Sequence, residues 1–436
     1  MKRLMTAVVL AIAATACYLM LEPVPDDTGP VLDADEATQV SRGEYLARAG
    51  NCLGCHTAPG GAPGAGGRAI ETPFGTIYTS NLTPHDNTGL GQWSSDDFWN
   101  ALHEGRARDG RLLYPAFPYT HYTRITRADV DAIRIWLKTL PPVDQPNREH
   151  ALRFPYDTQA ALLAWRALYF KPGVYRADDR RPADWNRGAY LVQGLGHCSA
   201  CHAPRNALGA SNDPEALAGG LMPEQNWYAP SLASTHEGGV GDWPKEDIVA
   251  LLRDGASRQA TVSGPMAEVV FGSTQYLSAS DLDAMAVYLK ALPATQSVKL
   301  ESKGIQDELR RERGARLYAE HCADCHGEHG EGKPGVWPAL AGNRAVTMDP
   351  PANPVRMVLG GGYAPATRGN PRPYGMPPFA AALDDEDIAL LVSHIRGSWG
   401  NSATPVSSLD VQRLRGNLHQ AARAPRNPPS VGSDAD

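Results

Sequence analysis

The sequence lacks the short motifs by which several large enzyme classes are recognised. It contains no glycine-rich nucleotide-binding loop, no nucleophile elbow of the hydrolase type and no zinc-binding signature. It also has no basic tract, and its net charge of -7 gives no electrostatic reason to expect nucleic acid as a partner. The acidic balance suits solubility and electrostatic docking to a redox partner. These absences argue against substrate chemistry in this chain and against nucleic-acid binding.

Cysteine is scarce, and the few cysteines follow one pattern. Six of the seven lie in three Cys-x-x-Cys-His motifs. In such a motif the two thiols add covalently to the vinyl groups of a haem, and the adjacent imidazole reaches the iron from one face of the ring. A thioredoxin-like pair or half of a zinc site also uses Cys-x-x-Cys, but neither explains a histidine after every second cysteine. The sequence therefore predicts three covalently bound haem c groups, held by Cys52, Cys55, His56, Cys198, Cys201, His202, Cys322, Cys325 and His326.

The amino terminus indicates export. Two basic residues precede an apolar run from Leu4 to about Leu21, as in a secretory signal or an uncleaved membrane anchor, and we assign residues 1–24 to this segment. Ala14-Thr15-Ala16 offers a cleavage site, and Cys17 directly after it is a candidate for lipid modification. The alternatives are therefore cleavage, lipidation and a retained anchor. Each of them places the haems outside the cytoplasm.

The repetition extends beyond the cysteines. Three similar runs each precede a motif by a similar distance: Arg-Gly-Glu-Tyr-Leu at 42–46, Arg-Gly-Ala-Tyr-Leu at 187–191 and Arg-Gly-Ala-Arg-Leu at 313–317. They predict a helix that leads into each haem site.

After each motif, apolar residues recur at i, i+3, i+4 and i+7 and predict an amphipathic closing helix. Each closing helix starts with an N-cap side chain three residues before an acid, which is a capping box with Asp in place of Glu. The cap and acid pairs are Thr126 with Asp129, Ser278 with Asp281, and Asp384 with Asp387. The expected order in each repeat is therefore leading helix, haem motif, loop with a ligand, and closing helix.

The repeats predict a mainly α chain of three small domains, at 40–143, 184–296 and 309–400. The loops are rich in glycine and proline, so the haem should supply much of each core. The connector at 144–183 contains an apolar helix, which we expect to pack within its own domain or to be buried between domains or against a partner. A polar tail at 401–436 is expected to be extended at its end. An amphipathic turn of helix or more within it is expected to lie loosely on the surface, with docking to a membrane or a subunit as the alternative.

A second axial ligand is expected from the loop before each closing helix. In the third repeat, Tyr374-Gly375-Met376-Pro377-Pro378 stands eight residues before the cap, in a loop suited to presenting a thioether. In the second repeat, Gly264-Pro265-Met266 occupies the equivalent place. We predict Met266 and Met376 as ligands. Methionine raises the potential of a haem relative to a second histidine.

The first repeat breaks this pattern. It has no methionine between Cys52 and the closing helix, and Phe117 stands where methionine is expected. A phenyl ring cannot ligate iron. The alternatives are His121, His103, His85 or an open position, and we predict His121 because it is nearest to the expected ligand loop. A haem with two histidine ligands would have the lowest potential of the three if other terms were equal.

With these residues in view, the chain resembles the triple-haem cytochrome c subunits of membrane-associated bacterial dehydrogenases. Members include the cytochrome subunits of quinoprotein alcohol dehydrogenase and of flavin-dependent gluconate, sorbitol and fructose dehydrogenases. The resemblance covers about residues 40–400 and implies three tandem class I cytochrome c-like domains. The runs that carry it are Arg-Gly-Glu-Tyr-Leu-Ala-Arg-Ala-Gly at 42–50, Glu-Thr-Pro-Phe-Gly-Thr-Ile-Tyr at 71–78, Trp-Asn-Arg-Gly-Ala-Tyr-Leu at 185–191, Gly-Pro-Met-Ala-Glu-Val-Val at 264–270 and Ser-Trp-Gly-Asn at 398–401.

The resemblance implies an electron-transfer subunit at the periplasmic face of the cytoplasmic membrane. Such a subunit takes electrons from a catalytic dehydrogenase subunit of flavin, quinoprotein or molybdenum type and passes them to ubiquinone, a terminal oxidase or another respiratory acceptor. It also supports Met266 and Met376 as ligands. The Ala-Phe-Pro-Tyr-x-His run at 116–121 departs from the alcohol dehydrogenase type. That run is more similar to cytochromes that accompany molybdenum hydroxylases of N-heterocycles such as nicotinate.

Two other functions fit three haem motifs. One is a haem enzyme of peroxidase or sulfur-oxidising type, which would act at an open first haem and would need acid or base groups nearby. The other is a freestanding electron shuttle. Turnover of peroxide or thiosulfate would favour the haem enzyme. Co-purification of a catalytic subunit would exclude the freestanding shuttle.

Overall fold

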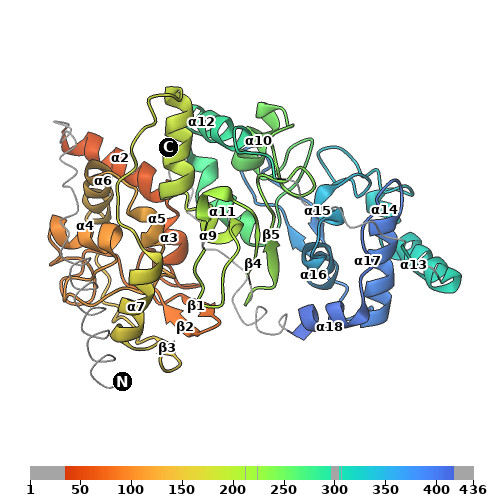
Figure 1. Ribbon diagram of the computed structural model, residues 1–436, viewed down its shortest axis with the longest axis horizontal. Helices are drawn as coiled ribbons and strands as arrows, with labels where there is room; N and C mark the ends of the chain where they lie inside the picture. Colours follow the sequence, from red (N-terminus) through yellow and green to blue (C-terminus); the bar gives the residue numbers. More distant parts are fainter. Residues whose placement is uncertain (1–34, 212, 223, 296–303, 306, 417–436) are drawn as a thin grey trace, which may run out of the picture.

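A computed structural model of the chain describes residues 35–211, 213–222, 224–295, 304–305 and 307–416. The expected signal or anchor at 1–24, with Cys17, lies outside these ranges. The described part is mainly α, as predicted, with a few short strands (Figure 1). Within the same ranges, no helix is long and apolar enough to cross a membrane.

The first part of the chain contains two long helices, a small sheet and the connector helix. Its elements are α2 (Glu36–Ala49), α3 (Cys52–Cys55), β1 (Ala69–Thr72), β2 (Gly75–Tyr78), α4 (Ser95–Glu104), α5 (Tyr119–Tyr122), α6 (Arg127–Leu137), β3 (Ala151–Leu152) and α7 (Gln159–Tyr169). The three strands form an antiparallel sheet in the order β1-β2-β3, so β3 of the connector joins the hairpin of the first repeat.

The second part repeats this order with a hairpin in place of the sheet. Its elements are α8 (Ala183–Tyr190), the π-helix η1 (Leu191–Leu195), α9 (Ser199–His202), the 3-10 helix η2 (Pro214–Ala216), β4 (Gly220–Met222), β5 (Trp227–Ala229), α10 (Lys245–Asp254), α11 (Pro265–Gly272), the 3-10 helix η3 (Thr274–Tyr276) and α12 (Ala279–Lys290). β4 and β5 pair antiparallel.

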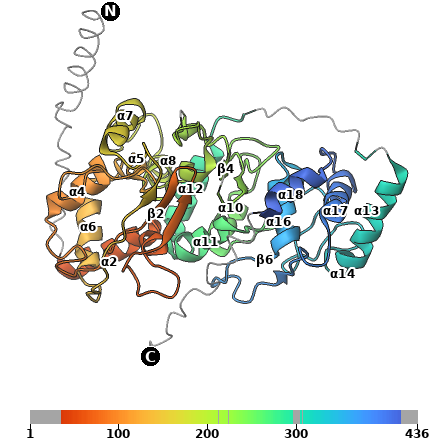
Figure 2. The same cartoon turned by 90° about the horizontal axis from the view of Figure 1, so that it is seen from below.

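The third part has a hairpin later in the sequence. Its elements are α13 (Glu308–His321), α14 (Ala323–His326), α15 (Arg344–Thr347), α16 (Ala352–Gly360), β6 (Gly362–Tyr363), β7 (Gly375–Met376), α17 (Asp385–Gly397) and α18 (Ser408–Gly416). We call residues 36–137, 183–290 and 308–397 the first, second and third units. Two perpendicular views place the second unit between the other two (Figures 1 and 2).

Each unit is built on a crossing of its leading helix with its closing helix. α2 packs on α6, α8 on α12, and α13 on α17. The glycine of each Arg-Gly pair lies at the crossing. A Cβ at Gly43 or Gly188 would overlap a carbonyl oxygen of the facing helix, and a Cβ at Gly314 would lie 2.7 Å from the carbonyl oxygen of Leu390. Glycine is therefore required because the two backbones touch.

The arginine before each glycine forms an ion pair with the acid in the first turn of the closing helix. The pairs are Arg42 with Asp129, Arg187 with Asp281, and Arg313 with Asp387. The predicted N-caps are confirmed, since the side chains of Thr126, Ser278 and Asp384 each accept the N–H of that acid. The predicted capping boxes are wrong in α6 and α12, where the acid pairs with arginine and does not bond back to the N-cap N–H.

The N-cap N–H groups of α6 and α12 are bound by tyrosines from the neighbouring unit. The hydroxyl of Tyr45, on α2, accepts the Ser278 N–H at 3.2 Å and donates to Asp281 at 2.6 Å. In return, the hydroxyl of Tyr190, on α8, accepts the Thr126 N–H at 3.2 Å and donates to Asp129. The first and second units thus cap each other's closing helices, an arrangement that we call the tyrosine exchange.

The third unit takes no part in this exchange. Arg316 stands at the position of the two tyrosines, three residues after the arginine of the Arg-Gly pair, and it is exposed beside Glu312. Other polar contacts join the third unit to the second. The Asn353 side chain bonds the backbone N–H and carbonyl of Tyr228 at 2.9 and 2.8 Å, and Arg344 pairs with Asp242.

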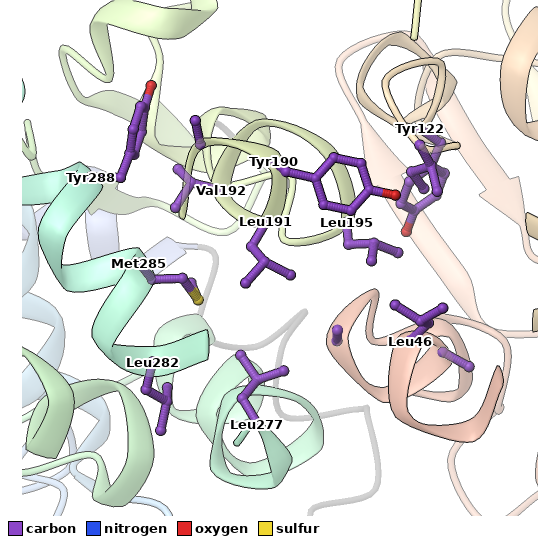
Figure 3. Packing of buried hydrophobic residues seen from close by; sticks show 14 of the residues in the cluster. Leu46, Tyr122, Tyr190, Leu191, Val192, Leu195, Leu277, Leu282, Met285 and Tyr288 are labelled. Atoms are coloured by element: carbon purple, nitrogen blue, oxygen red, sulfur yellow. The ribbon is translucent and has the colours of Figure 1, made fainter. Parts of the chain in front are cut away.

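The buried apolar side chains follow the same division. One cluster combines residues of the first and second units, and a separate cluster belongs to the third unit with α18. Figure 3 shows Leu46 and Tyr122 of the first unit facing Leu191 and Leu195 of the second. The first two units therefore share one core.

Two segments differ from what their sequences suggest. The connector helix α7 buries only Leu162 fully, while Leu163 and Leu168 stay exposed, so the apolar helix is packed on one face alone. The start of the tail is not a loose surface helix. Val411 on α18 is fully buried, and Arg415 pairs with Asp385 of α17. The apolar face of α18 completes the core of the third unit.

We expect Gly43→Ala to lower the free energy of unfolding by about 1–3 kcal/mol, because the added methyl group forces α2 and α6 apart. Urea unfolding of the haem-loaded chain, followed by circular dichroism, measures the change. Gly397→Ala is the matched control, since a Cβ there meets nothing within 4 Å. Equal stability of Gly43→Ala and the wild type would contradict the crossing described above.

We expect Tyr190→Phe to destabilise the chain by about 1–3 kcal/mol, because it leaves the Thr126 N–H and a buried carboxylate without the hydroxyl. Tyr363→Phe is the control, since this tyrosine is 70% exposed. The same unfolding measurement should show the loss in the transition of the first two units and leave that of the third unit in place. A variant as stable as the control would show that the tyrosine exchange adds nothing to stability.

Candidate functional site

Each Cys-x-x-Cys-His motif folds as one helical turn, at α3, α9 and α14. In each turn the N–H of the histidine donates to the carbonyl of the first cysteine at 2.9 Å. The turn thus places both cysteines and the histidine of a motif within or directly beside one short helix. The six cysteines are free thiols, so none of the motifs is a disulfide. In the described ranges, no group of three or more His, Cys, Asp or Glu side chains is placed to hold a metal ion.

Each motif histidine is held by a backbone carbonyl. Nδ1 bonds the carbonyl oxygen of Ser80 at 2.7 Å for His56, of Pro230 at 2.7 Å for His202, and of Pro338 at 3.0 Å for His326. A carbonyl oxygen only accepts, so Nδ1 carries the proton and the Nε2 lone pair is left for a metal. Burial lowers the pKa of all three imidazoles, although the carbonyl bond opposes this change. They are therefore neutral and oriented as ligands.

The loop after each motif repeats two backbone hydrogen bonds. The carbonyl of the motif histidine accepts the N–H of a glycine, and the residue two positions before that glycine accepts the N–H of a leucine. The glycine and leucine donors are Gly66 and Leu82 in the first unit, Gly219 and Leu232 in the second, and Gly332 and Leu340 in the third. The acceptors of the leucine N–H have positive φ, and Leu217 (φ 46°) stands where the other two units have glycine. Three motifs far apart in sequence therefore share one local architecture.

Sequence reasoning missed the carbonyl groups that orient the imidazoles. A signal for them exists, because Ser80, Pro230 and Pro338 each stand two residues before the leucine that closes the loop. The spacing from the motif varies among the three units. A search at a fixed distance from the motif histidine would therefore not find these carbonyl groups.

The thiols have an environment that suits haem attachment better than thiol redox chemistry. Cys52 and Cys198 are half-buried, and desolvation raises the pKa of each thiol to about 12. A thioredoxin-like site needs the opposite shift, since its thiolate is the nucleophile. Free thiols, a neutral imidazole with an available Nε2 and an apolar surround are the groups that a covalent haem requires. The residues present at all three motifs therefore fit haem c.

The motifs of the first two units lie close together. α11 of the second unit packs on α3 of the first. Arg68 donates to the Gly54 carbonyl inside the first motif and pairs with Glu268 on α11 at 3.0 Å. Burial raises the pKa of the Cys201 thiol, and the charge of Cys55 adds to that rise.

The two predicted methionine ligands lie before the closing helices, in a helix and a strand where loops were expected. Met266 is in the first turn of α11, partly buried against the shared core. Met376 is in β7, opposite Gly362 of β6, and is partly buried against the core of the third unit. Their ligation of iron stays a prediction.

Phe117 occupies the backbone position that Met266 has in the second unit. α4 and α10 end at Gly105 and Gly255, both in the left-handed conformation. The carbonyl of Gly105 accepts the Leu113 N–H at 2.8 Å, and that of Gly255 accepts the Val262 N–H at 2.8 Å. Phe117 and Met266 each follow four residues after that donor. Counted from this bond, Phe117 therefore corresponds to Met266, although Phe117 lies in a bend before α5 and Met266 in the first turn of α11.

His121, the predicted ligand of the first haem, is bound to the second unit. Its Nε2 bonds the Ser199 hydroxyl, within the second motif, at 2.7 Å, and its Nδ1 bonds the Thr120 hydroxyl at 3.1 Å. Burial, with His197 and two arginines nearby, lowers its pKa to about 3. Ligation by His121 stays a prediction, and it would require Nε2 to leave Ser199.

The two other histidines considered as ligands are also engaged. His103 is buried, stacks on Trp99 with 4.4 Å between ring centroids, and lies 3.4 Å from the Thr123 hydroxyl. His85 bonds the Thr88 hydroxyl at 2.8 Å through Nδ1.

We expect the stability of the chain to fall as the pH drops from about 6.5 towards 4, partly because of His121. The unfolded chain takes up a proton at His121 below about pH 6.5, whereas the folded chain does not until about pH 3. His121→Gln should therefore make the loss of stability shallower, as measured by thermal unfolding over this range. His329→Gln, at an exposed site, is the control. An unchanged slope for His121→Gln would contradict the lowered pKa.

Comparison with known proteins identifies the same chemistry. A cytochrome c family model matches residues 311–399, in the third unit. The cytochrome c subunit of a quinone-type alcohol dehydrogenase from Gluconobacter oxydans is 39% identical over 404 residues, which cover 88% of this chain and 83% of that protein. The gluconate 2-dehydrogenase cytochrome c subunit of Pantoea cypripedii is 38% identical and covers 86% and 89%.

A third relative extends over almost the whole chain. A nicotinate dehydrogenase subunit of Pseudomonas putida is 37% identical over 426 residues, which are 97% of this chain and 34% of that longer protein. Two of these relatives are thus matched along more than four fifths of their own length. The chain therefore belongs to the family of cytochrome c subunits of bacterial dehydrogenases.

Proposed function

We propose that the chain carries three covalent haem c groups, one at each motif, and transfers electrons within a dehydrogenase complex. The observation that supports this number is the threefold recurrence of one local architecture. Each unit has the motif turn, an imidazole held through Nδ1 and the two loop hydrogen bonds that follow it. Haem supplies one-electron chemistry when bound. The role of the chain is to attach the haems, to orient their ligands and to exclude water.

Three tandem class I cytochrome c-like domains, at 40–143, 184–296 and 309–400, are the arrangement that we propose. Met266 and Met376 would be the sixth ligands in the second and third domains. Their loops support this assignment, because each presents a partly buried thioether beside a core. Methionine ligation would give these haems a higher potential than a second histidine would.

The partner that we propose is a catalytic dehydrogenase subunit, since the relatives are named as subunits of dehydrogenases. Its cofactor would be a flavin, a quinone or molybdenum. The similarity to the nicotinate dehydrogenase subunit, together with the Ala-Phe-Pro-Tyr-x-His run at 116–121, favours a dehydrogenase of N-heterocycles. The acceptor would be ubiquinone or a terminal oxidase. The apolar run at the amino terminus supports export to the periplasmic face of the cytoplasmic membrane and association with that membrane.

We expect the chain purified from native membranes to bring a catalytic subunit with it and to carry three haems by intact mass. The double variant Cys322→Ala and Cys325→Ala should lose one haem and keep two, because the other attachment sites lie in separate units. Cys17→Ala serves as the control and should keep three. Two haems in the wild type would contradict the proposed haem number, and a chain that purifies alone would favour a freestanding shuttle.

A further inference from the structure

The first haem site differs from the other two at one position of the ligand loop. The hydrogen-bonded turn that follows α4 matches the turn that follows α10, and Phe117 stands in the place of Met266. The six methionines within the described ranges all belong to the second and third units. The first unit therefore has a hydrocarbon ring where its neighbour has a sulfur atom.

The contacts of Phe117 place it at the first motif. Its ring lies 5.5 Å, between centroids, from the ring of Tyr122. Tyr122 is buried, and its hydroxyl donates to the Gly50 carbonyl, two residues before Cys52, at 3.1 Å. Burial raises the pKa of Tyr122, and the thiols of the first motif add to the rise, which agrees with a position beside them. Phe117 and Tyr122 thus form an aromatic wall, which Tyr122 links to the residues just before the first motif.

The three histidines considered as ligands have other partners, and the ring of His197, from the second unit, meets that of Tyr122 edge-on at 5.7 Å. His121 bonds Ser199 through Nε2 and Thr120 through Nδ1, so ligation would cost the contact with the second unit. His103 is stacked on Trp99 and lies beside Glu104, with 3.5 Å between its Nε2 and the carboxylate. His85 contacts Thr88 and, at 3.8 Å, Asp144. None of these arrangements presents a histidine as Met266 is presented in the second unit.

We propose that the first haem has no sixth ligand from the protein and that its iron is open to small uncharged diatomic molecules. This inference rests on the proposed function, because it assumes a haem at the first motif. An apolar wall suits carbon monoxide or nitric oxide, which need no hydrogen-bond donor. It disfavours anions, since their charge would lose its hydration in such a pocket. The polarity and access of the distal pocket decide what a five-coordinate haem binds.

Carbon monoxide titration of the reduced, full-length chain tests the proposal. One of the three haems should take up carbon monoxide, seen as a shift in one third of the haem absorption. Phe117→Met should reduce this fraction to near zero and add a third methionine-to-iron band in the near-infrared spectrum of the ferric chain. Phe154→Met is the matched control, because Phe154 is 82% exposed, and it should behave as the wild type.

His121→Ala separates the proposal from the alternative ligand. If the first iron is open, this variant binds carbon monoxide at one haem, as the wild type does. Lack of binding by the wild type together with binding by His121→Ala would overturn the proposal and assign His121 as the ligand. Lack of binding by both would overturn it as well.

Intact mass distinguishes a failure of this inference from a failure of the proposed function. Three covalent haems with no carbon monoxide uptake would contradict the open site alone. Fewer than three haems would contradict the proposed function. Uptake at two or three haems would contradict methionine ligation by Met266 or Met376. The variants Met266→Ala and Met376→Ala would then identify which of the two methionines is not a ligand.

Discussion

The close crossing of a leading helix with a closing helix is the constraint on which each unit depends. Because glycine lets the two backbones touch, the end of the leading helix is fixed, and the haem motif follows that end directly. The arginine before the glycine pairs with an acid in the first turn of the closing helix, where an acid also complements the helix dipole. The dipeptide Arg-Gly therefore sets both the distance and the register of the two helices.

At the motifs, two opposing influences act on the imidazole. Burial favours the neutral ring, and the bond from Nδ1 to a carbonyl favours its protonated form. The first influence is the larger. The hydrogen bond to the carbonyl nevertheless matters for the chemistry, because it decides that Nδ1 carries the proton and in which direction Nε2 points. The same carbonyl precedes the leucine that closes the loop, so the orientation of the ligand is built into the backbone and does not depend on a side chain.

The sequence revealed the features that are local. The three motifs, the N-caps and the loops of Met266 and Met376 are recognisable because their signals span a few residues. The tyrosine exchange was not predictable, since Tyr45 meets Asp281 across more than two hundred residues and no periodicity points to it. The capping boxes of α6 and α12 are absent for the same reason, because an arginine and a tyrosine from distant segments bind the acid and the N-cap N–H. The sequence alone did not show that α18 is packed in the third unit, because its apolar face is buried only against α17.

The tyrosine exchange has a consequence for how the chain folds. The N-cap N–H of α6 is satisfied by a hydroxyl of the second unit, and that of α12 by a hydroxyl of the first. Neither unit can complete its own hydrogen bonds, or its share of the common core, in the absence of the other. The first two units must therefore form and melt together, whereas the third has its own core and can open alone. The chain has three haem motifs, whereas the buried side chains of its described part fall into two clusters that we expect to unfold separately.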